Sequence, residues 1–351
     1  MTECGPARAR HHQGVLLRLA DPDERYAAVR LCSDLPLPDE RCAYARHNGE
    51  WRLELAAPPV ARLEYELEVV DHDGESARVR DPGNPHVAPG AFGEKSVLLL
   101  PGYRAPGWLA EDGVPGQTQE LVTPGRGLGT EVHVGIWSPA DAGPGERLPL
   151  LVAHDGPEYD RLAGLTRFAA AGIGSGALPR HRVALLAPGE RDEWYSASAR
   201  YAGALVRDVL PAIRAAVGVD GAPVGMGASL GALAMLHAQR RHPGTFGALF
   251  LQSGSFFTPQ FDSQESGFPR YQRIVRFVRA TLREGVQADP VPVALTCGSA
   301  EENLENNRLM TRTLANQGYP AALHELPDMH NYTAWRDAFE PYLTALLARA
   351  W

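Results

Sequence analysis

The sequence predicts an α/β fold with two domains, in which a small β-sandwich precedes a doubly wound parallel sheet. Two observations predict this arrangement. Residues 14–100 consist of short runs in which apolar and polar side chains alternate, the period of half-buried strands. After residue 128, short continuous apolar runs alternate with helix-favouring segments, which is typical of parallel strands covered by helices on both faces. A chain of 351 residues is long enough for both domains.

The first domain is predicted from five alternating runs. Turn signals separate them, among them Asp21-Pro-Asp, Asn48-Gly and Asp73-Gly. This spacing indicates a small antiparallel sandwich. The predicted strands cover residues 15–19, 26–31, 51–55, 62–70 and 95–100.

Residues 101–124 are rich in proline, glycine and polar side chains, with Trp108 as a bulky anchor. Such a composition is typical of the segment between two domains. We therefore predict a sandwich domain with its linker over residues 1–114 and a second domain over residues 115–351.

The second domain is predicted from alternating strands and helices. The apolar runs lie at residues 131–137, 148–153, 182–187, 223–226, 248–251, 292–296 and 322–326. Helical patterns lie at residues 199–217, 230–242, 270–284, 303–318 and 333–350. Strands that alternate with helices in this way form a doubly wound sheet.

Composition excludes several classes of protein. The net charge of -8 provides no basic surface for nucleic acid or for an anionic membrane, so neither is expected as a partner. No apolar run is long enough to predict a membrane-spanning helix, and the N-terminus lacks the apolar segment of a secretory signal.

Cys4, Cys32, Cys42 and Cys297 are scattered, which indicates free thiols in a reducing cytoplasm. We expect no cofactor and no metal ion, and a homodimer remains open.

The segment at residues 223–242 carries the strongest functional signal. Its apolar start runs into Gly227-Ala-Ser229-Leu-Gly231, and a helical pattern follows at once. Strand, sharp turn with a serine, then helix is the context of a nucleophile elbow, which lifts the hydroxyl out of the sheet. We therefore predict Ser229 as a nucleophile, against the alternative of a glycine-rich turn with a buried serine.

A nucleophilic serine needs a base and an acid that orients it. His330 is the predicted base, because it lies between the last strand and the last helix, where an α/β-hydrolase supplies its histidine. The acid is expected in the loop after the preceding strand, which contains Glu301 and Glu302. We favour Glu301 and keep Glu302 as the alternative; the order serine, acid, histidine is the one that α/β-hydrolases use.

The backbone N–H of Leu230 and one N–H from residues 154–159 are predicted to bind the oxyanion. Pro157 has no N–H, so Gly156 or Glu158 must supply the second donor, and both remain open. The adjacent His154 and Asp155 are interpreted as structural residues rather than as metal ligands.

The loop at residues 189–196 opens on the same edge of the sheet. Its arginine, acids and aromatic residues could bind an aromatic or anionic substrate, or an Arg191–Glu193 ion pair could hold the loop. Arg191 and Tyr195 are the candidates of this loop for substrate binding.

With these residues in place, the chain resembles the enterochelin-esterase (Fes-like) family of siderophore esterases, in the wider esterase D group. The matching segments are HDGPEY at 154–159, RDEWYS at 191–196, GASLG at 227–231, CGSAEENLENN at 297–307 and HNYTAWR at 330–336. The last segment has a tryptophan behind its histidine, and the resemblance makes Trp335, behind His330, a further candidate for substrate binding. The N-terminal sandwich is similar to the immunoglobulin-like domain that precedes the α/β-hydrolase domain in that family. The resemblance implies hydrolysis of ester bonds in a catecholate trilactone siderophore and release of its iron in the cytoplasm.

An anionic ferric catecholate would need cationic partners, for which Arg191, Arg270 and Arg336 are the candidates. Three other functions are considered. The same catalytic residues could serve a feruloyl or acetyl carbohydrate esterase, with Trp51 and Tyr65 of the sandwich contacting a glycan. They could also serve a thioesterase, cyclase or acyl transferase of natural-product assembly. A non-catalytic binding protein is the third alternative.

Overall fold

The computed structural model describes residues 14–143 and 145–351, which form two compact units, the first ending at Tyr103 and the second beginning at Arg104. The division falls before the predicted boundary at residue 114. Trp108 explains the difference, because its ring packs at 5.5 Å from that of Phe168 and at 6.3 Å from that of Phe339, both in the second unit.

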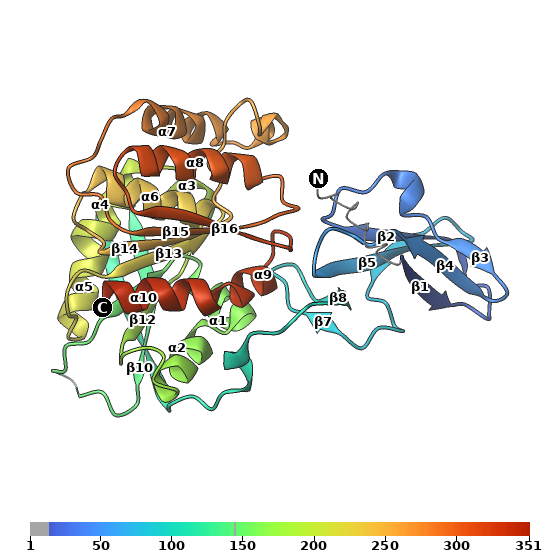
Figure 1. The fold of residues 1–351 in the computed structure, drawn as a ribbon, viewed down its shortest axis with the longest axis horizontal. Coiled ribbons are helices and arrows are strands. Elements are labelled where there is room, and N and C mark those ends of the chain that lie inside the picture. The colour runs from blue at the N-terminus through green and yellow to red at the C-terminus, as the bar shows by residue number, and fades with distance from the viewer. Residues whose placement is uncertain (1–13, 144) are drawn as a thin grey trace, which may run out of the picture. The chain divides into compact units, whose positions relative to one another are not determined.

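The first unit contains two antiparallel sheets, and the strand colours of Figure 1 follow them from blue to cyan. The smaller sheet has the order β1 (Val15–Ala20), β4 (Glu50–Leu55), β3 (Ala45–His47). The larger sheet has the order β2 (Tyr26–Ser33), β5 (Arg62–Asp71), β8 (Lys95–Leu99), β7 (Val87–Ala88). In addition, β6 (Ser76–Val79) pairs with β5. A short helix, η1 (Asp39–Arg41), follows β2 in the chain. The five predicted strands are present; β3, β6 and β7 are too short for alternation to reveal them.

Both aromatic residues considered for glycan binding lie in the core of this unit. Trp51 is 7% exposed and its indole N–H donates to Asp21, while Tyr65 is 1% exposed and its hydroxyl donates to Asp81 at 2.7 Å. Neither ring is available as a flat binding surface.

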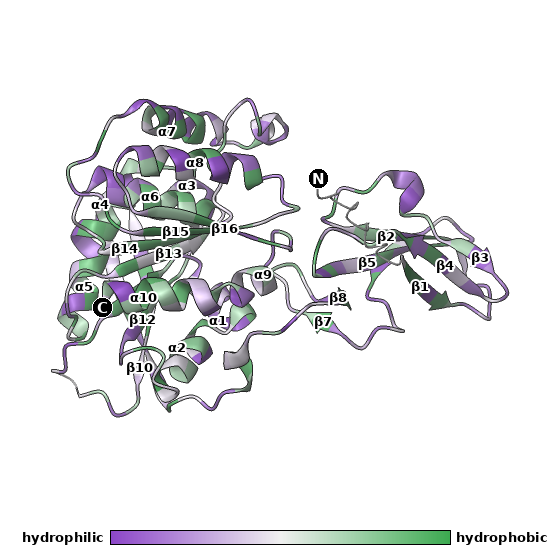
Figure 2. Ribbon diagram, in the orientation of Figure 1, coloured by the Kyte–Doolittle hydropathy of each residue, from purple (hydrophilic) through white to green (hydrophobic). Residues whose placement is uncertain are grey.

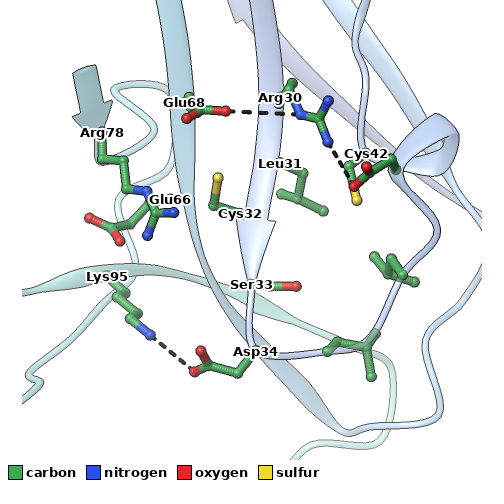
Figure 3. A pocket seen from close by; sticks show the side chains of 13 residues that line it. Arg30, Leu31, Cys32, Ser33, Asp34, Cys42, Glu66, Glu68, Arg78 and Lys95 are labelled. Carbon is green, nitrogen blue, oxygen red and sulfur yellow. Dashed lines mark hydrogen bonds and ion pairs between the residues drawn. The ribbon is translucent and has the colours of Figure 1, made fainter. Parts of the chain in front are cut away.

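A cavity of about 460 Å³ lies in the first unit and is lined by side chains of both charges (Figure 3). Arg30 pairs with Asp39 at 2.9 Å, and Lys95 pairs with Asp34 at 3.0 Å. With Arg78, Glu66 and Glu68 the lining has three cationic and four acidic side chains, so most of its charges are compensated.

The second unit is built on an eight-stranded sheet with the order β16-β15-β14-β13-β11-β12-β10-β9. Strands β11 to β16 are parallel, and β10 and β9 are antiparallel at one edge. Figure 2 shows the central strands mostly in the colour of hydrophobic residues, and every residue of β12, β13 and β14 is buried. The strands are β9 (Gly116–Gly125), β10 (Thr130–Pro139), β11 (Leu150–Ala153), β12 (Arg182–Leu186), β13 (Val224–Ala228), β14 (Ala248–Gln252), β15 (Val293–Gly298) and β16 (Ala321–Leu326).

Helices cover both faces of this sheet, as the apolar periodicity predicts (Figure 1). One face packs against α3 (Arg191–Tyr195), α4 (Ala199–Ala204), η3 (Leu205–Val209), α5 (Leu210–Ala216), α6 (Leu230–Arg241), α7 (Tyr271–Arg283) and α8 (Leu304–Asn316). The other packs against η2 (Gly107–Ala110), α1 (Gly156–Ala163), α2 (Leu165–Gly174), α9 (Tyr332–Asp337), η5 (Phe339–Leu343) and α10 (Thr344–Ala350). The short helix η4 (Ser263–Gly267) precedes α7. β9 is not among the predicted strands, because most of its residues are exposed and its large apolar residues are Leu121 and Val122 alone.

The remaining sequence predictions concern thiols and membranes. Cys32, Cys42 and Cys297 are free thiols, of which Cys297 is buried and the other two are half-buried. Cys4 and the N-terminal segment predicted to lack a secretory signal lie outside the described residues. None of the helices in the described part of the chain has the length and apolar character that crossing a membrane requires.

Candidate active site

Ser229 lies at the sharp turn between β13 and α6, as the pentapeptide predicts. Its backbone has φ 55° and ψ −123°, a strained conformation for a residue with a side chain. Gly227 makes the turn possible, since a Cβ there would lie 2.5 Å from the carbonyl carbon of Gly231. The strand and helix therefore pass too closely for any other residue at position 227.

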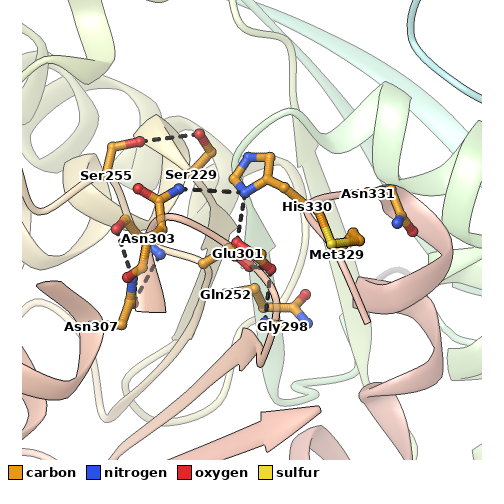
Figure 4. Close-up of polar contacts among 12 residues, drawn as sticks. Ser229, Gln252, Ser255, Gly298, Glu301, Asn303, Asn307, Met329, His330 and Asn331 are labelled. Atoms are coloured by element: carbon orange, nitrogen blue, oxygen red, sulfur yellow. Dashed lines mark hydrogen bonds and ion pairs between the residues drawn. The ribbon is translucent and has the colours of Figure 1, made fainter. Parts of the chain in front are cut away.

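His330 and Glu301 come together from the loops after β16 and β15 (Figure 4). His330 Nδ1 donates to Glu301 Oε2 at 2.8 Å. The other carboxylate oxygen, Oε1, accepts from Gly298 N at 2.8 Å and from Ser253 Oγ at 2.7 Å. The Glu301 side chain is 1% exposed, so its charge is held by hydrogen bonds rather than by water. Glu302 is exposed and accepts from Gln264, so Glu301 is the glutamate that contacts His330.

In Figure 4 the imidazole of His330 lies between Glu301 and Ser229. Among the described residues, the hydrogen-bond partner of Ser229 Oγ is Ser255 Oγ, at 3.1 Å, and not His330. A serine–histidine bond that is absent without substrate and forms when substrate binds is common in hydrolases. Ser229 thus lies beside the His330–Glu301 pair and is hydrogen-bonded to Ser255 rather than to His330.

The predicted oxyanion donors lie at two helix N-termini. Leu230 is the first residue of α6, and Gly156 and Glu158 lie in the first turn of α1, where backbone N–H groups have no partner within the helix. Asp155 N donates to the hydroxyl of Tyr195 at 3.2 Å and is thus engaged. Gly156 is tightly confined, because a Cβ there would lie 2.2 Å from the Cα of Leu185.

His154 connects these two helix starts. Its Nδ1 donates to the carbonyl oxygen of Gly231 at 2.9 Å, and burial lowers the pKa of this histidine to about 4. The ring is therefore neutral at pH 7 and acts as a structural link, as predicted. No group of three or more histidine, cysteine or acidic side chains in the described ranges is placed to hold a metal ion.

Arg191 and Asp155 form a bidentate ion pair, with Nε–Oδ1 and Nη2–Oδ2 distances of 2.8 Å each. The Arg191–Glu193 ion pair, which was the alternative to substrate binding, is not formed, because Glu193 instead accepts from Arg270 and Arg273 at 2.6 Å. Arg336 pairs with Asp337 at 2.7 Å. Each of the three arginines proposed for an anionic substrate therefore already has a carboxylate partner.

The structure places Tyr195 and Trp335, both predicted to bind substrate, in the interior. Tyr195 is 0% exposed. Trp335 is 7% exposed, its ring lies edge-on to that of His330 at 5.0 Å, and its indole N–H donates to Ser253 Oγ at 3.0 Å. Tyr195 therefore has no exposed surface for a substrate and Trp335 has little, and each ring supports a neighbouring polar residue.

Ser253, Ser255 and Asn307 were not singled out from the sequence, yet all three contact the candidate site or its loop. A signal was present, since Gln252-Ser-Gly-Ser255 directly follows a predicted strand at the edge that carries Ser229 and Glu301. Short hydroxyl-bearing turns are common, however, and only the fold brings this one to the site.

A strained serine at a strand-to-helix turn, with a histidine–carboxylate pair from the last two strands, defines an α/β-hydrolase. The chain belongs to the Esterase family, because the model of that family, described as "Putative esterase", matches residues 125–346. A comparison with curated protein sequences found no match.

Solved structures of enterobactin esterases share the fold over almost the whole chain. The ferric enterobactin esterase of Salmonella typhimurium is 20% identical, with a TM-score of 0.77 over 96% of this chain and 94% of that one. The enterobactin esterase of Shigella flexneri, in the presence of 2,3-dihydroxy-N-benzoyl-serine, is 19% identical, with a TM-score of 0.75 over 96% and 93%. A ferulic acid esterase is 17% identical, with a TM-score of 0.56 over 68% of this chain and 100% of that one. At these identities the similarity shows a common fold.

Proposed function

We propose that this chain is a serine esterase that hydrolyses the ester bonds of a catecholate trilactone siderophore in the cytoplasm, which releases the bound iron. The observation that carries the chemistry is the 2.8 Å bond between His330 and Glu301 beside Ser229 at its elbow. The substrate class is supported by the fold shared with enterobactin esterases over 96% of this chain, both units included.

In the acylation step, Ser229 Oγ attacks the ester carbonyl carbon while its proton passes to His330 Nε2. Glu301 holds the proton on Nδ1 and stabilises the imidazolium that forms. The backbone N–H of Leu230 and that of Gly156 or Glu158 donate to the oxyanion. When the tetrahedral intermediate collapses, the carbon–oxygen bond to the leaving alcohol breaks, and that alcohol takes the proton from His330.

In the deacylation step, water gives a proton to the same nitrogen and adds to the acyl carbon. The bond to Ser229 Oγ then breaks, the serine recovers its proton, and a carboxylic acid leaves. Repetition on each ester of a trilactone gives linear fragments, which bind ferric iron less strongly than the ring because they are less preorganised.

A ferric catecholate is anionic, and Arg191 and Arg270 are its proposed partners. Because each already pairs with a carboxylate, a substrate anion would share a guanidinium group with Asp155 or Glu193. A guanidinium group that is shared in this way binds the substrate anion with moderate affinity. The catechol rings must then be recognised by the shape of the site.

The test compares turnover of a ferric catecholate trilactone, a feruloyl ester and a short-chain nitrophenyl ester. We expect trilactone opening by the parent protein and a loss of about 10⁴-fold or more in Ser229→Ala. Ser263→Ala, which removes an exposed serine of the same unit, serves as the control.

Two results would contradict the proposal in different ways. Unchanged turnover in Ser229→Ala would exclude the mechanism. Serine-dependent turnover of the simple esters alone would keep the mechanism and move the substrate to the carbohydrate or biosynthetic alternatives.

A further inference from the structure

The turn at residues 253–255, which follows β14, contacts two members of the proposed triad at once. Ser253 Oγ donates to Glu301 Oε1 at 2.7 Å, and Ser255 Oγ lies 3.1 Å from Ser229 Oγ. Both serines are buried, at 0% and 2% exposure. A single turn therefore brings one hydroxyl to the acid and another to the nucleophile.

The direction of the hydroxyl of Ser253 is determined by Trp335. An indole N–H can only donate, so Ser253 Oγ accepts from Trp335 Nε1 and its own proton remains for another partner. That partner is the carboxylate of Glu301, which can only accept when ionised. Trp335, Ser253 and Glu301 thus form a chain in which each bond polarises the next.

The turn has little freedom to move. Ser253 has φ 47°, a left-handed conformation that a side chain disfavours. Asn307 binds both backbone polar groups of the next residue: its Oδ1 accepts from Gly254 N at 3.0 Å, and its Nδ2 donates to Gly254 O at 2.9 Å. The strain and these bonds indicate that the turn is held in one position.

We propose that residues 253–255 position the triad, with Ser253 stabilising the ionised form of Glu301 and Ser255 orienting the hydroxyl of Ser229. This proposal rests on the proposed function, since it assumes that Ser229 is the nucleophile. Ser253 acts through Glu301 and is a positioning residue. Ser255 contacts a reacting atom, and its hydroxyl can donate to Ser229 Oγ as the serine loses its proton to His330.

The two serines predict different kinetic signatures. In Ser253→Gly, which relieves the strain and removes the hydroxyl, the deprotonated Glu301–His330 pair loses one of two donors to Oε1. The pair then takes up a proton at higher pH. In a plot of rate against pH, the fall in rate on the acid side should therefore shift to higher pH by about one unit; we call this part of the plot the acid limb. In Ser255→Ala the limb should stay in place while the plateau rate falls about tenfold.

The experiment measures the rate of Ser229 labelling by a fluorophosphonate, and hydrolysis of a nitrophenyl ester, from pH 4.5 to 9. Trp335→Phe keeps an aromatic ring and removes the N–H, so it should shift the acid limb in the same direction as Ser253→Gly and by less. Thr333→Val is the control, because it removes a buried hydroxyl on α9 that has no hydrogen-bond partner among residues 14–143 and 145–351. Thermal unfolding of each variant separates loss of activity from loss of fold.

The outcomes separate this proposal from the proposed function. A parent protein that is not labelled at Ser229 contradicts both. A parent that is labelled, with acid limbs in Ser253→Gly and Trp335→Phe identical to that of Thr333→Val, contradicts the role of Ser253. A labelling rate in Ser255→Ala equal to that of the parent contradicts the role of Ser255.

Discussion

Glu301→Gln is the substitution that examines the candidate site most directly, because the two side chains have nearly the same shape. Three donors surround the carboxylate: Gly298 N and Ser253 Oγ at Oε1, and His330 Nδ1 at Oε2. A carboxamide offers one acceptor oxygen and one NH₂ group. In either orientation the NH₂ group therefore faces a donor.

The two orientations differ in cost. If the NH₂ group faces His330, the imidazole must carry its proton on Nε2 instead of Nδ1. Nε2 then cannot take the proton of Ser229. In serine proteases this wrong tautomer lowers kcat by about 10⁴-fold. If the NH₂ group faces Gly298 and Ser253, both donors to Oε1 lose their acceptor, at a cost of about 1–3 kcal/mol for each donor that stays unpaired. His330 then keeps its tautomer but loses a charge-assisted bond, worth about 10²-fold at 1.36 kcal/mol per factor of ten. We therefore expect kcat to fall by between about 10² and 10⁴.

The assay is steady-state hydrolysis of a nitrophenyl ester at pH 8, with thermal unfolding to show that the variant is folded. Glu302→Gln is the matched control, because this neighbouring glutamate is exposed and contacts Gln264 instead of His330. We expect its kcat to stay within about twofold of the parent, as for surface substitutions away from such contacts. A folded Glu301→Gln protein with kcat within tenfold of the parent, or a larger loss in Glu302→Gln, would refute the assignment of the acid.

Two further predictions concern stability and the oxyanion loop. Burial lowers the pKa of His154 and of His181 to about 4, which is below the pKa of a histidine in the unfolded chain. Between these two pKa values the unfolded state binds more protons than the folded state. The free energy of unfolding therefore falls as the pH drops from about 6.5 towards 4, by up to about 3 kcal/mol for each residue. Urea unfolding at pH 7.5 and 5 measures this loss, and an equal or higher midpoint at pH 5 would contradict it. Gly156→Ala places a Cβ 2.2 Å from the Cα of Leu185 and must displace the loop, so we expect kcat to fall by about 10² or more. Gly285→Ala is the control: its Cβ would have no described atom within 4 Å, so kcat should be unchanged. Equal kcat values in the two alanine variants would exclude a role of the loop in binding the oxyanion.

Predictions made from the sequence were most accurate where the signal is local. The alternation of apolar runs and helical patterns predicted α6 at residues 230–242, against Leu230–Arg241 in the structure, and α7 and α8 with similar accuracy. The boundary predicted at residue 114 differs from the division after Tyr103, because the composition of residues 104–114 resembles a linker while the ring of Trp108 packs against Phe168 in the second unit.

The sequence by itself determined the elbow of Ser229 and the two loops that carry His330 and a glutamate, because carboxyl ends of parallel strands meet at one edge whatever the side chains do. Only the tertiary structure decided which glutamate contacts His330, since Glu301 and Glu302 are neighbours in the chain and differ only in the direction of their side chains. It also decided the partners of Arg191 and Glu193, and the bond from Trp335 to Ser253. These contacts join residues 36 to 82 positions apart, and their geometry depends on side-chain directions that no local pattern encodes.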